Sequence, residues 1–345
     1  GAAGEKYQTS VVTNRRAFVA NVQYTTDGGN LQNFGDQIRY SEINKFLTFP
    51  ELNFIDIGVN DGEEFVKLES FADRLLAFKE KTLYIINIGG GSDTQWFLES
   101  EHKNMGVDFH ALTVKTDFGI AWVNKNGLFF YDGRQIKNLQ TKILESEWSG
   151  FVNADTMIGY EPTHKHLVIV RDAAASGSTS GDAYVYSFIT NSFTFVEDMV
   201  VDAVKTNIIT DAYNKMTLGS ALDELESYDG EPDSGATFHI ILKDDDFGMP
   251  NVVKKIYGVT VEYASNATNT NGIKYVYTND SGTKQDVANA GSLASTSNDL
   301  DINKATFGTP LLASSFQVQL DMDGDSLQKI NNVGVEYRPI YKRIT

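Results

Sequence analysis

The sequence predicts an all-β protein, with a β-propeller-like domain over residues 1–245 followed by an antiparallel β-sandwich domain over residues 250–345. Composition is the first observation: 21 Phe and 16 Tyr favour strands, 29 Gly supply turns, and only 6 Pro interrupt strand ladders. The second is that helical signals are few and short, near residues 141–148 and 220–228. The third is the length of 345 residues, which is typical of about two domains.

The propeller-like domain is predicted from paired apolar runs that are joined by short polar turns, such as the turn over residues 79–82. In the first two pairs the second runs begin about 45 residues apart, at Leu83 and Leu128, which is typical of four-stranded propeller blades. A further incomplete blade is expected over residues 17–40. The paired runs are 75–78 with 83–86, 118–123 with 128–131, and 166–170 with 184–188 and 193–196.

A change of pattern indicates where the first domain ends. An acidic, Gly-rich segment over residues 223–235 and the acidic run 244–246 are typical of a linker, so we expect the boundary between Leu222 and Pro250. Beyond it, apolar and polar residues alternate as in half-buried antiparallel strands. These strands are expected at 256–263, 273–277, 316–320 and 333–337, with a long polar loop over 281–303.

Composition also excludes several classes of function. The chain has no Cys, so disulfides, thiolate metal sites and cysteine nucleophiles are impossible. No apolar run approaches the roughly 18 residues that span a bilayer, so we expect no membrane insertion. The formal charge of −17 opposes the phosphate neutralisation on which nucleic-acid affinity mostly rests, so a dedicated DNA-binding protein is not expected.

Two segments contain residues that could bind a metal ion. The carboxylates of Asp321, Asp323 and Asp325 alternate as in calcium loops, but the glycine and the final glutamate of an EF-hand are missing, so a hairpin turn is the favoured interpretation. His164 and His166 share one face of a strand, as in some zinc sites, but no third ligand is apparent. We therefore expect no metal and no other cofactor.

Converging carboxylates are the catalytic signal that matters in this fold, because some propellers hydrolyse glycans with two such acids. The candidate acids are Asp56, Asp61, Glu101 and Asp117, although a chain this acidic contains such residues by chance. The sequence has no Gly-x-Ser-x-Gly, no His-Glu-x-x-His and no phosphate-binding loop after the glycines at 89–91. The prediction is that the chain is not an enzyme, and no catalytic residue is assigned.

The order of the segments resembles the propeller portion of tail nozzle and tail-tube proteins of short-tailed bacteriophages. The similarity is good over residues 15–140, looser over 155–200, and extends to a closing strand at 334–339. The segments on which it rests are 36–42, 55–63, 65–79, 83–86, 106–107, 112–114, 120–123 and 126–133.

This resemblance implies a structural virion protein that is made in the bacterial host cytoplasm and resides in the phage tail. It further implies a homo-oligomeric ring of six or twelve copies around the exit channel, in contact with portal, adaptor or fibre proteins. Genomic DNA would pass through this ring during ejection without specific binding. The alternative, on the same fold, is a propeller protein that binds or hydrolyses cell-surface polysaccharide, which would need aromatic platforms and converging acids.

Overall fold

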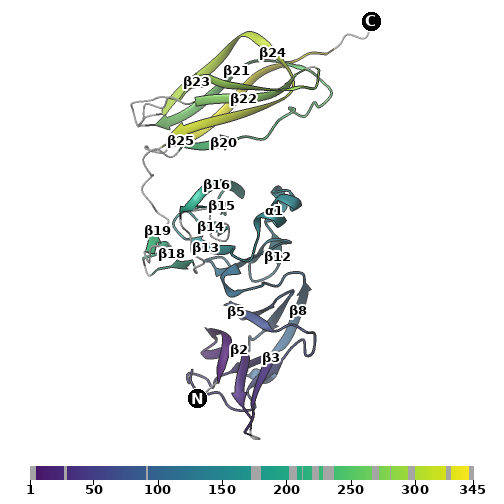
Figure 1. Cartoon of the computed structure of the whole chain (residues 1–345), viewed down its shortest axis with the longest axis vertical. Coiled ribbons are helices and arrows are strands. Elements are labelled where there is room, and N and C mark those ends of the chain that lie inside the picture. Colours follow the sequence, from purple (N-terminus) through teal and green to yellow (C-terminus); the bar gives the residue numbers. More distant parts are fainter. Residues whose placement is uncertain are drawn as a thin grey trace. The chain divides into compact units, whose positions relative to one another are not determined.

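The computed structural model divides the chain into two compact units, unit 1 (residues 1–229) and unit 2 (residues 230–345), and each is described by itself. Nearly all of the regular structure is strand, so the predicted all-β fold is confirmed (Figure 1). Within the described residues, no helix is both long enough and apolar enough to cross a membrane. The described residues are 5–26, 29–90, 92–171, 180–201, 208–211, 213–219, 225–227, 237–265, 272–279, 281–293, 300–323 and 328–341.

Unit 1 consists of antiparallel sheets whose strands pair in chain order. The first sheet contains β1 (Lys6–Thr13), β2 (Arg16–Thr25), β3 (Leu31–Tyr40) and β4 (Phe54–Asp56). The second contains β5 (Phe65–Phe71), β6 (Arg74–Lys79), β7 (Thr82–Asn87) and β8 (Phe97–Lys103). Antiparallel strands that are neighbours both in the chain and in the sheet can be joined by short turns. Short polar turns of this kind join β5 to β6 and β6 to β7.

The remaining sheets of unit 1 repeat this plan. The third sheet contains β9 (Thr113–Lys115), β10 (Ile120–Asn124), β11 (Gly127–Tyr131) and β12 (Ile136–Asn138). The fourth contains β13 (Met157–Glu161), β14 (His166–Val170), β15 (Ser180–Ser187) and β16 (Ser192–Val201). The fifth contains β17 (Ile209–Thr210), β18 (Met216–Gly219) and β19 (Leu225–Ser227). The short helices are η1 (Asp93–Gln95), η2 (His110–Leu112), η3 (Gln140–Lys142) and α1 (Glu145–Phe151).

Strands in the middle of the sheets are buried on both faces. In β6, Leu75 and Ala77 belong to the core between the first and second sheets, whereas Leu76 and Phe78 belong to the core shared with the third and fourth sheets. Because successive side chains of a strand point to opposite faces, one continuous apolar run supplies two cores. β14 does the same, with 167 and 169 in one core and 168 and 170 in the next.

Unit 2 is a β-sandwich built around one long strand, β24 (Leu300–Asp323). Its first half pairs with β21 (Lys254–Ser265), which also pairs with β25 (Gln328–Pro339). Its second half pairs with β22 (Gly272–Asn279) and β20 (Thr237–Ile241), and β23 (Lys284–Ser292) pairs with β22. A strand that changes partners in this way lets the two layers enclose one apolar core. The core includes Ile256, Val259, Ile273, Tyr275, Phe316 and Leu320.

The expected boundary between Leu222 and Pro250 includes the point at which the structure divides, between residues 229 and 230. β20, at residues 237–241, lies before residue 245 but pairs with residues 319–323 of β24 in unit 2. Residues from 230 onward therefore belong with unit 2. No local pattern predicts this pairing, because β20 is short, lies in an acidic segment and pairs with a strand about 80 residues further along the chain.

Candidate functional site

A buried lysine joins the first two sheets of unit 1. The Lys79 side chain at the end of β6 is 0% exposed, and its Nζ donates hydrogen bonds to Asp36 Oδ1 at 2.6 Å and to the carbonyl of Gly58 at 2.9 Å. It also contacts both carboxylate oxygens of Asp61, at 2.8 and 2.9 Å. The sequence pattern predicts that Lys79 lies in a polar turn. Its burial is possible because these oxygens satisfy the ammonium group.

The loop between β4 and β5 is shaped to reach this lysine. Gly58 has a φ of +64°, and a Cβ there would lie 2.6 Å from both Asp61 Oδ2 and the Tyr84 hydroxyl oxygen. The Tyr84 hydroxyl in turn donates a hydrogen bond to Asp61 Oδ2 at 3.3 Å. A glycine is therefore needed where the loop passes over the Lys79 cluster, which we define as Asp36, Asp61, Lys79 and Tyr84.

These contacts shift the pKa values of Asp61 and Tyr84. Burial raises the pKa of Asp61, but the hydrogen bonds from Lys79 and from the backbone of Glu63 outweigh it, so this pKa lies below its usual value. Burial, followed by the charges of Glu101 and Asp61, raises the pKa of Tyr84 to about 12. At neutral pH the cluster therefore contains a charged carboxylate beside an un-ionised phenol.

A pocket of about 460 Å³ lies beside this cluster, between β4 of the first sheet and the β7 and β8 strands of the second. Both aromatic and acidic side chains face it, and Phe54 and Phe97 are 40% and 55% exposed. Its aromatic lining is Tyr40, Phe54, Tyr84, Trp96 and Phe97, and its acidic lining is Asp56, Asp93 and Glu101. We call this the β4–β8 pocket.

One wall of the β4–β8 pocket is held by a hydrogen-bonded group around Asp93. The Tyr40 hydroxyl donates to Asp93 Oδ2 at 3.2 Å, and Arg16 Nη2 lies 4.0 Å from the same oxygen. The Arg16 guanidinium also stands over the rings of Tyr40 and Trp96, at 5.3 and 5.6 Å from their centres. Burial and then the Asp93 charge raise the pKa of Tyr40, so it stays a hydrogen-bond donor.

The carboxylates of the other two lining acids, Asp56 and Glu101, have fewer hydrogen-bond and ion-pair partners among the described residues. Among the residues that the structure describes, Asp56 accepts one side-chain hydrogen bond, from Gln37 Nε2 at 3.1 Å. Glu101 stands directly opposite Tyr84 in the β7–β8 ladder and has no ion-pair or hydrogen-bond partner within the described residues. These two acids of different sheets therefore face the same pocket with lone pairs available for a ligand.

The structure separates the four candidate acids into three places. Asp56 and Glu101 line the β4–β8 pocket, and Asp61 lies next to it in the Lys79 cluster. Asp117 lies elsewhere, where it accepts a hydrogen bond from the Tyr160 hydroxyl at 3.1 Å. Its role is to connect the third and fourth sheets.

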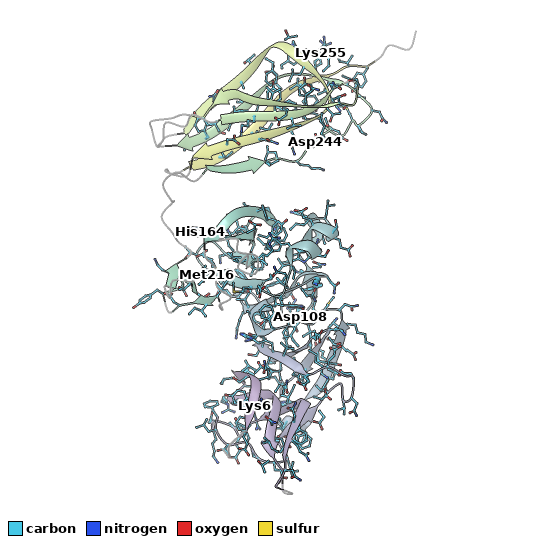
Figure 2. All side chains as sticks on the ribbon, in the orientation of Figure 1. Lys6, Asp108, His164, Met216, Asp244 and Lys255 are labelled. Carbon is cyan, nitrogen blue, oxygen red and sulfur yellow. The ribbon has the colours of Figure 1, made fainter. Side chains whose placement is uncertain are left out.

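The possible metal ligands have other partners. His164, in the turn before β14 (Figure 2), contacts buried Glu161 through Nδ1 at 3.1 Å, and its ring stacks on His166. Asp321 forms an ion pair with Lys274 on the neighbouring strand, and residues 324–327 of that motif lie outside the described part of the chain. In the described residues, no three His, Asp or Glu side chains are grouped so that they could hold a metal ion.

The residues that complete the pocket are not predicted by the sequence pattern. Trp96 and Asp93 come from the segment around η1, and Phe54 from the very short strand β4. A Ser92-Asp93 start that caps a helical turn could have indicated η1, because Ser92 accepts a hydrogen bond from the Thr94 backbone. Nothing in the local pattern indicates that 54–58 and 93–101 meet.

Comparison with known proteins gave no sequence match: no family model and no curated protein matches the chain. Solved structures with some similarity include an exo-β-1,3-galactanase from Phanerochaete chrysosporium, at 9% identity and a TM-score of 0.24, covering 94% of this chain and 79% of that one. A family 43 arabinoxylan arabinofuranohydrolase from Bacillus subtilis has 10% identity and a TM-score of 0.25, with 95% and 66% covered. The Nup133 β-propeller domain of Vanderwaltozyma polyspora has 9% identity and a TM-score of 0.29, with 90% and 93% covered.

The prediction that the chain is not an enzyme is contradicted by this comparison, in which glycoside hydrolases recur, and we withdraw it. The TM-scores are too low to assign any activity to this chain. The prediction had a physical weakness as well. It treated Asp56 and Glu101 as chance members of an acidic sequence, whereas the fold brings them to one pocket.

Replacing Lys79 with Met is expected to lower the free energy of unfolding by about 2–4 kcal/mol, because the charges of Asp36 and Asp61 lose their partner. The loss should be smaller than for a fully buried pair, since these carboxylates are 27% and 29% exposed. Urea denaturation followed by tryptophan fluorescence measures it. The control is Lys81→Met at an exposed position, which should change stability by less than about 0.5 kcal/mol. Equal effects of the two substitutions would contradict the role of the cluster.

Alkaline pH is expected to lower the contribution of the Lys79 cluster to the free energy of unfolding. The folded pKa of Tyr84, about 12, exceeds the usual value of 10.0, so its contribution to stability is complete below pH 10 and is lost as the pH rises through about 12. Tyr84→Phe should therefore show a shallower fall of the unfolding free energy over this range than the unmodified chain. Tyr7→Phe, at a residue 57% exposed, should leave the slope unchanged. An identical slope for Tyr84→Phe would contradict the assignment.

Proposed function

We propose that unit 1 binds a polysaccharide in the β4–β8 pocket. The observation behind this proposal is the lining of the pocket, where five aromatic residues and three carboxylates share one concave surface. Small-molecule sites are mostly apolar with a few placed polar groups, and their volumes are roughly 300–1,000 Å³. The volume of about 460 Å³ lies within this range.

The lining suits the two surfaces of a sugar ring. A pyranose presents C–H groups on its faces, which pack on aromatic rings such as the exposed Phe54 and Phe97. Its hydroxyl groups lie around the edge and donate hydrogen bonds to carboxylates, which are stronger than bonds between neutral partners. Asp56 and Glu101 have lone pairs free for this purpose.

Because the pocket contains these two acids, hydrolysis of the bound saccharide should be measured together with binding. Glycosidic cleavage requires one carboxyl group to protonate the leaving oxygen and a second to activate water or attack the sugar. Asp56 of β4 and Glu101 of β8 line the pocket from different sheets, so a sugar bound in the pocket would have access to two carboxyl groups. Binding remains the core of the proposal because the aromatic surface is its main support.

Binding is tested by titrating oligosaccharides from bacterial and plant surface polymers into the full chain, with calorimetric detection. Phe97→Ala should weaken the affinity for a binding sugar by about ten-fold, which is typical of removing an aromatic contact at the centre of a site. The matched control is Phe195→Ala, since Phe195 is 45% exposed and also lies on the last strand of its sheet, β16. The same mixtures are assayed for new reducing ends.

Two results would contradict the proposal. One is that no saccharide of the panel binds. The other is that Phe97→Ala and Phe195→Ala weaken binding equally, since the site would then lie outside the β4–β8 pocket. New reducing ends that disappear in Glu101→Gln would extend the proposal from binding to hydrolysis.

A second proposal is that the chain is a tail component of a short-tailed phage, with copies arranged as a ring around the DNA channel. Its support is the resemblance over residues 15–140 and a set of large apolar side chains that unit 1 leaves in solvent. Exposed apolar patches often mark protein contacts. The exposed side chains include Tyr7 at 57%, Val12 at 63%, Leu47 at 96% and Leu52 at 83%.

Electron microscopy of virions labelled through this chain tests the ring. Six or twelve copies around the tail axis are expected, because a heterologous contact that closes on itself gives a cyclic assembly. Leu47→Ser with Leu52→Ser should reduce ring formation if these side chains lie at the contact, without changing the fold of the free chain. Single copies located off the tail axis would refute the ring.

A further inference from the structure

We infer that the sugar recognised by the β4–β8 pocket is positively charged, which makes the ligand an amino-sugar polymer with free amines. This inference rests on the proposed saccharide binding and specifies its substrate class. It follows from the charges that surround the pocket and from the rings that line it.

The side chains that line the pocket provide negative charge only. Asp56, Asp93 and Glu101 line it, and the lining includes no Lys or Arg within the described residues. Asp93 is the one whose charge is balanced, by Arg16 at 4.0 Å. The partner of Asp56 is a neutral amide, and Glu101 has no partner in the described part of the chain, so two carboxylate charges remain uncompensated.

The aromatic lining favours cations for a second reason. The face of an aromatic ring is electron-rich, and it attracts ammonium and guanidinium groups within about 6 Å of its centre. Two rings of this pocket already attract the chain's own Arg16, and a third, Tyr84, has Lys79 Nζ at 5.8 Å from its centre. Phe54 and Phe97 have exposed surface that a ligand ammonium can reach.

The cations near the pocket do not reverse this preference. Lys79 contacts the two carboxylates of Asp36 and Asp61, so the Lys79 cluster as a whole is negative. A polymer of uronic acids would bring carboxylates toward Asp56 and Glu101 in a chain of formal charge −17. The Glu101 carboxylate attracts a ligand ammonium group, whereas it repels a uronate carboxylate. The ammonium group also donates hydrogen bonds to Glu101, as a hydroxyl group of a neutral sugar would.

The test compares three probes of equal length by calorimetry at low salt: oligomers of glucosamine, of N-acetylglucosamine and of glucose. The glucosamine oligomer is expected to bind about ten-fold more tightly than the other two, from one cation–π contact and one exposed ion pair. Added salt should reduce this ratio, because screening acts on the charge and not on the stacking.

Two variants on the same strand locate the effect. Glu101→Gln should lower the preference for glucosamine by about three-fold, the contribution of an exposed ion pair. Glu99→Gln removes the same charge from β8 but at a residue that pairs with Arg74 and lines a different pocket, so the preference should not change. Equal effects of both variants would mean a general charge effect and would overturn the inference.

The remaining outcomes separate the inference from the proposal on which it rests. Equal affinity for all three oligomers, or tighter binding of a neutral one, overturns the inference that the sugar is positively charged and leaves the proposal of saccharide binding intact. If none of these oligomers and no sugar of the wider panel binds, saccharide binding itself is wrong and the inference falls with it.

Discussion

The fold of unit 1 depends on strands that are buried on both faces. Leu75 and Ala77 face one core while Leu76 and Phe78 face the next, so no sheet can form its full core without its neighbours. The inner strands β6, β7, β10 and β14 are therefore apolar between their ends, and their strongly polar side chains stand at the ends of the strands. The β4–β8 pocket is lined by the outer strands β4 and β8 of the first two sheets, together with the inner strand β7.

Polar groups that do enter the space between sheets need partners, because an unpaired buried charge is costly. Lys79 meets this need with two carboxylates and a carbonyl. Buried tyrosine hydroxyls find such partners by donating hydrogen bonds to carboxylates of neighbouring segments. These bonds also link the sheets to the segments that pack against them. The pairs are Tyr40 with Asp93, Tyr84 with Asp61, Tyr160 with Asp117, and Tyr184 with Glu147. Two of these pairs adjoin the pocket, so the contacts that join the first two sheets also fix its walls.

Sequence reasoning succeeded where the signal is local. The runs 75–78 and 83–86 form the predicted hairpin because their apolar pattern and the turn between them lie within a dozen residues. It failed where partners are distant: Lys79 looked like a turn residue because Asp36 and Asp61 precede it by 43 and 18 residues. Asp56 and Glu101 were named as candidates, but only the packing of two sheets shows that they share a pocket with Trp96. The pairing of β20 with β24, about 80 residues further along the chain, is likewise not indicated by the local sequence pattern.

We propose that the β4–β8 pocket between the first two sheets, whose walls are fixed by buried polar pairs, is a ligand site. A crystal structure of the chain soaked with a glucosamine oligomer tests it most directly. The claim predicts sugar density between β4 and β8, with a ring packed on Phe54 or Phe97 and an amine within hydrogen-bond distance of Glu101 or Asp56. Density confined to another surface of unit 1, with this pocket filled only by water, would contradict it.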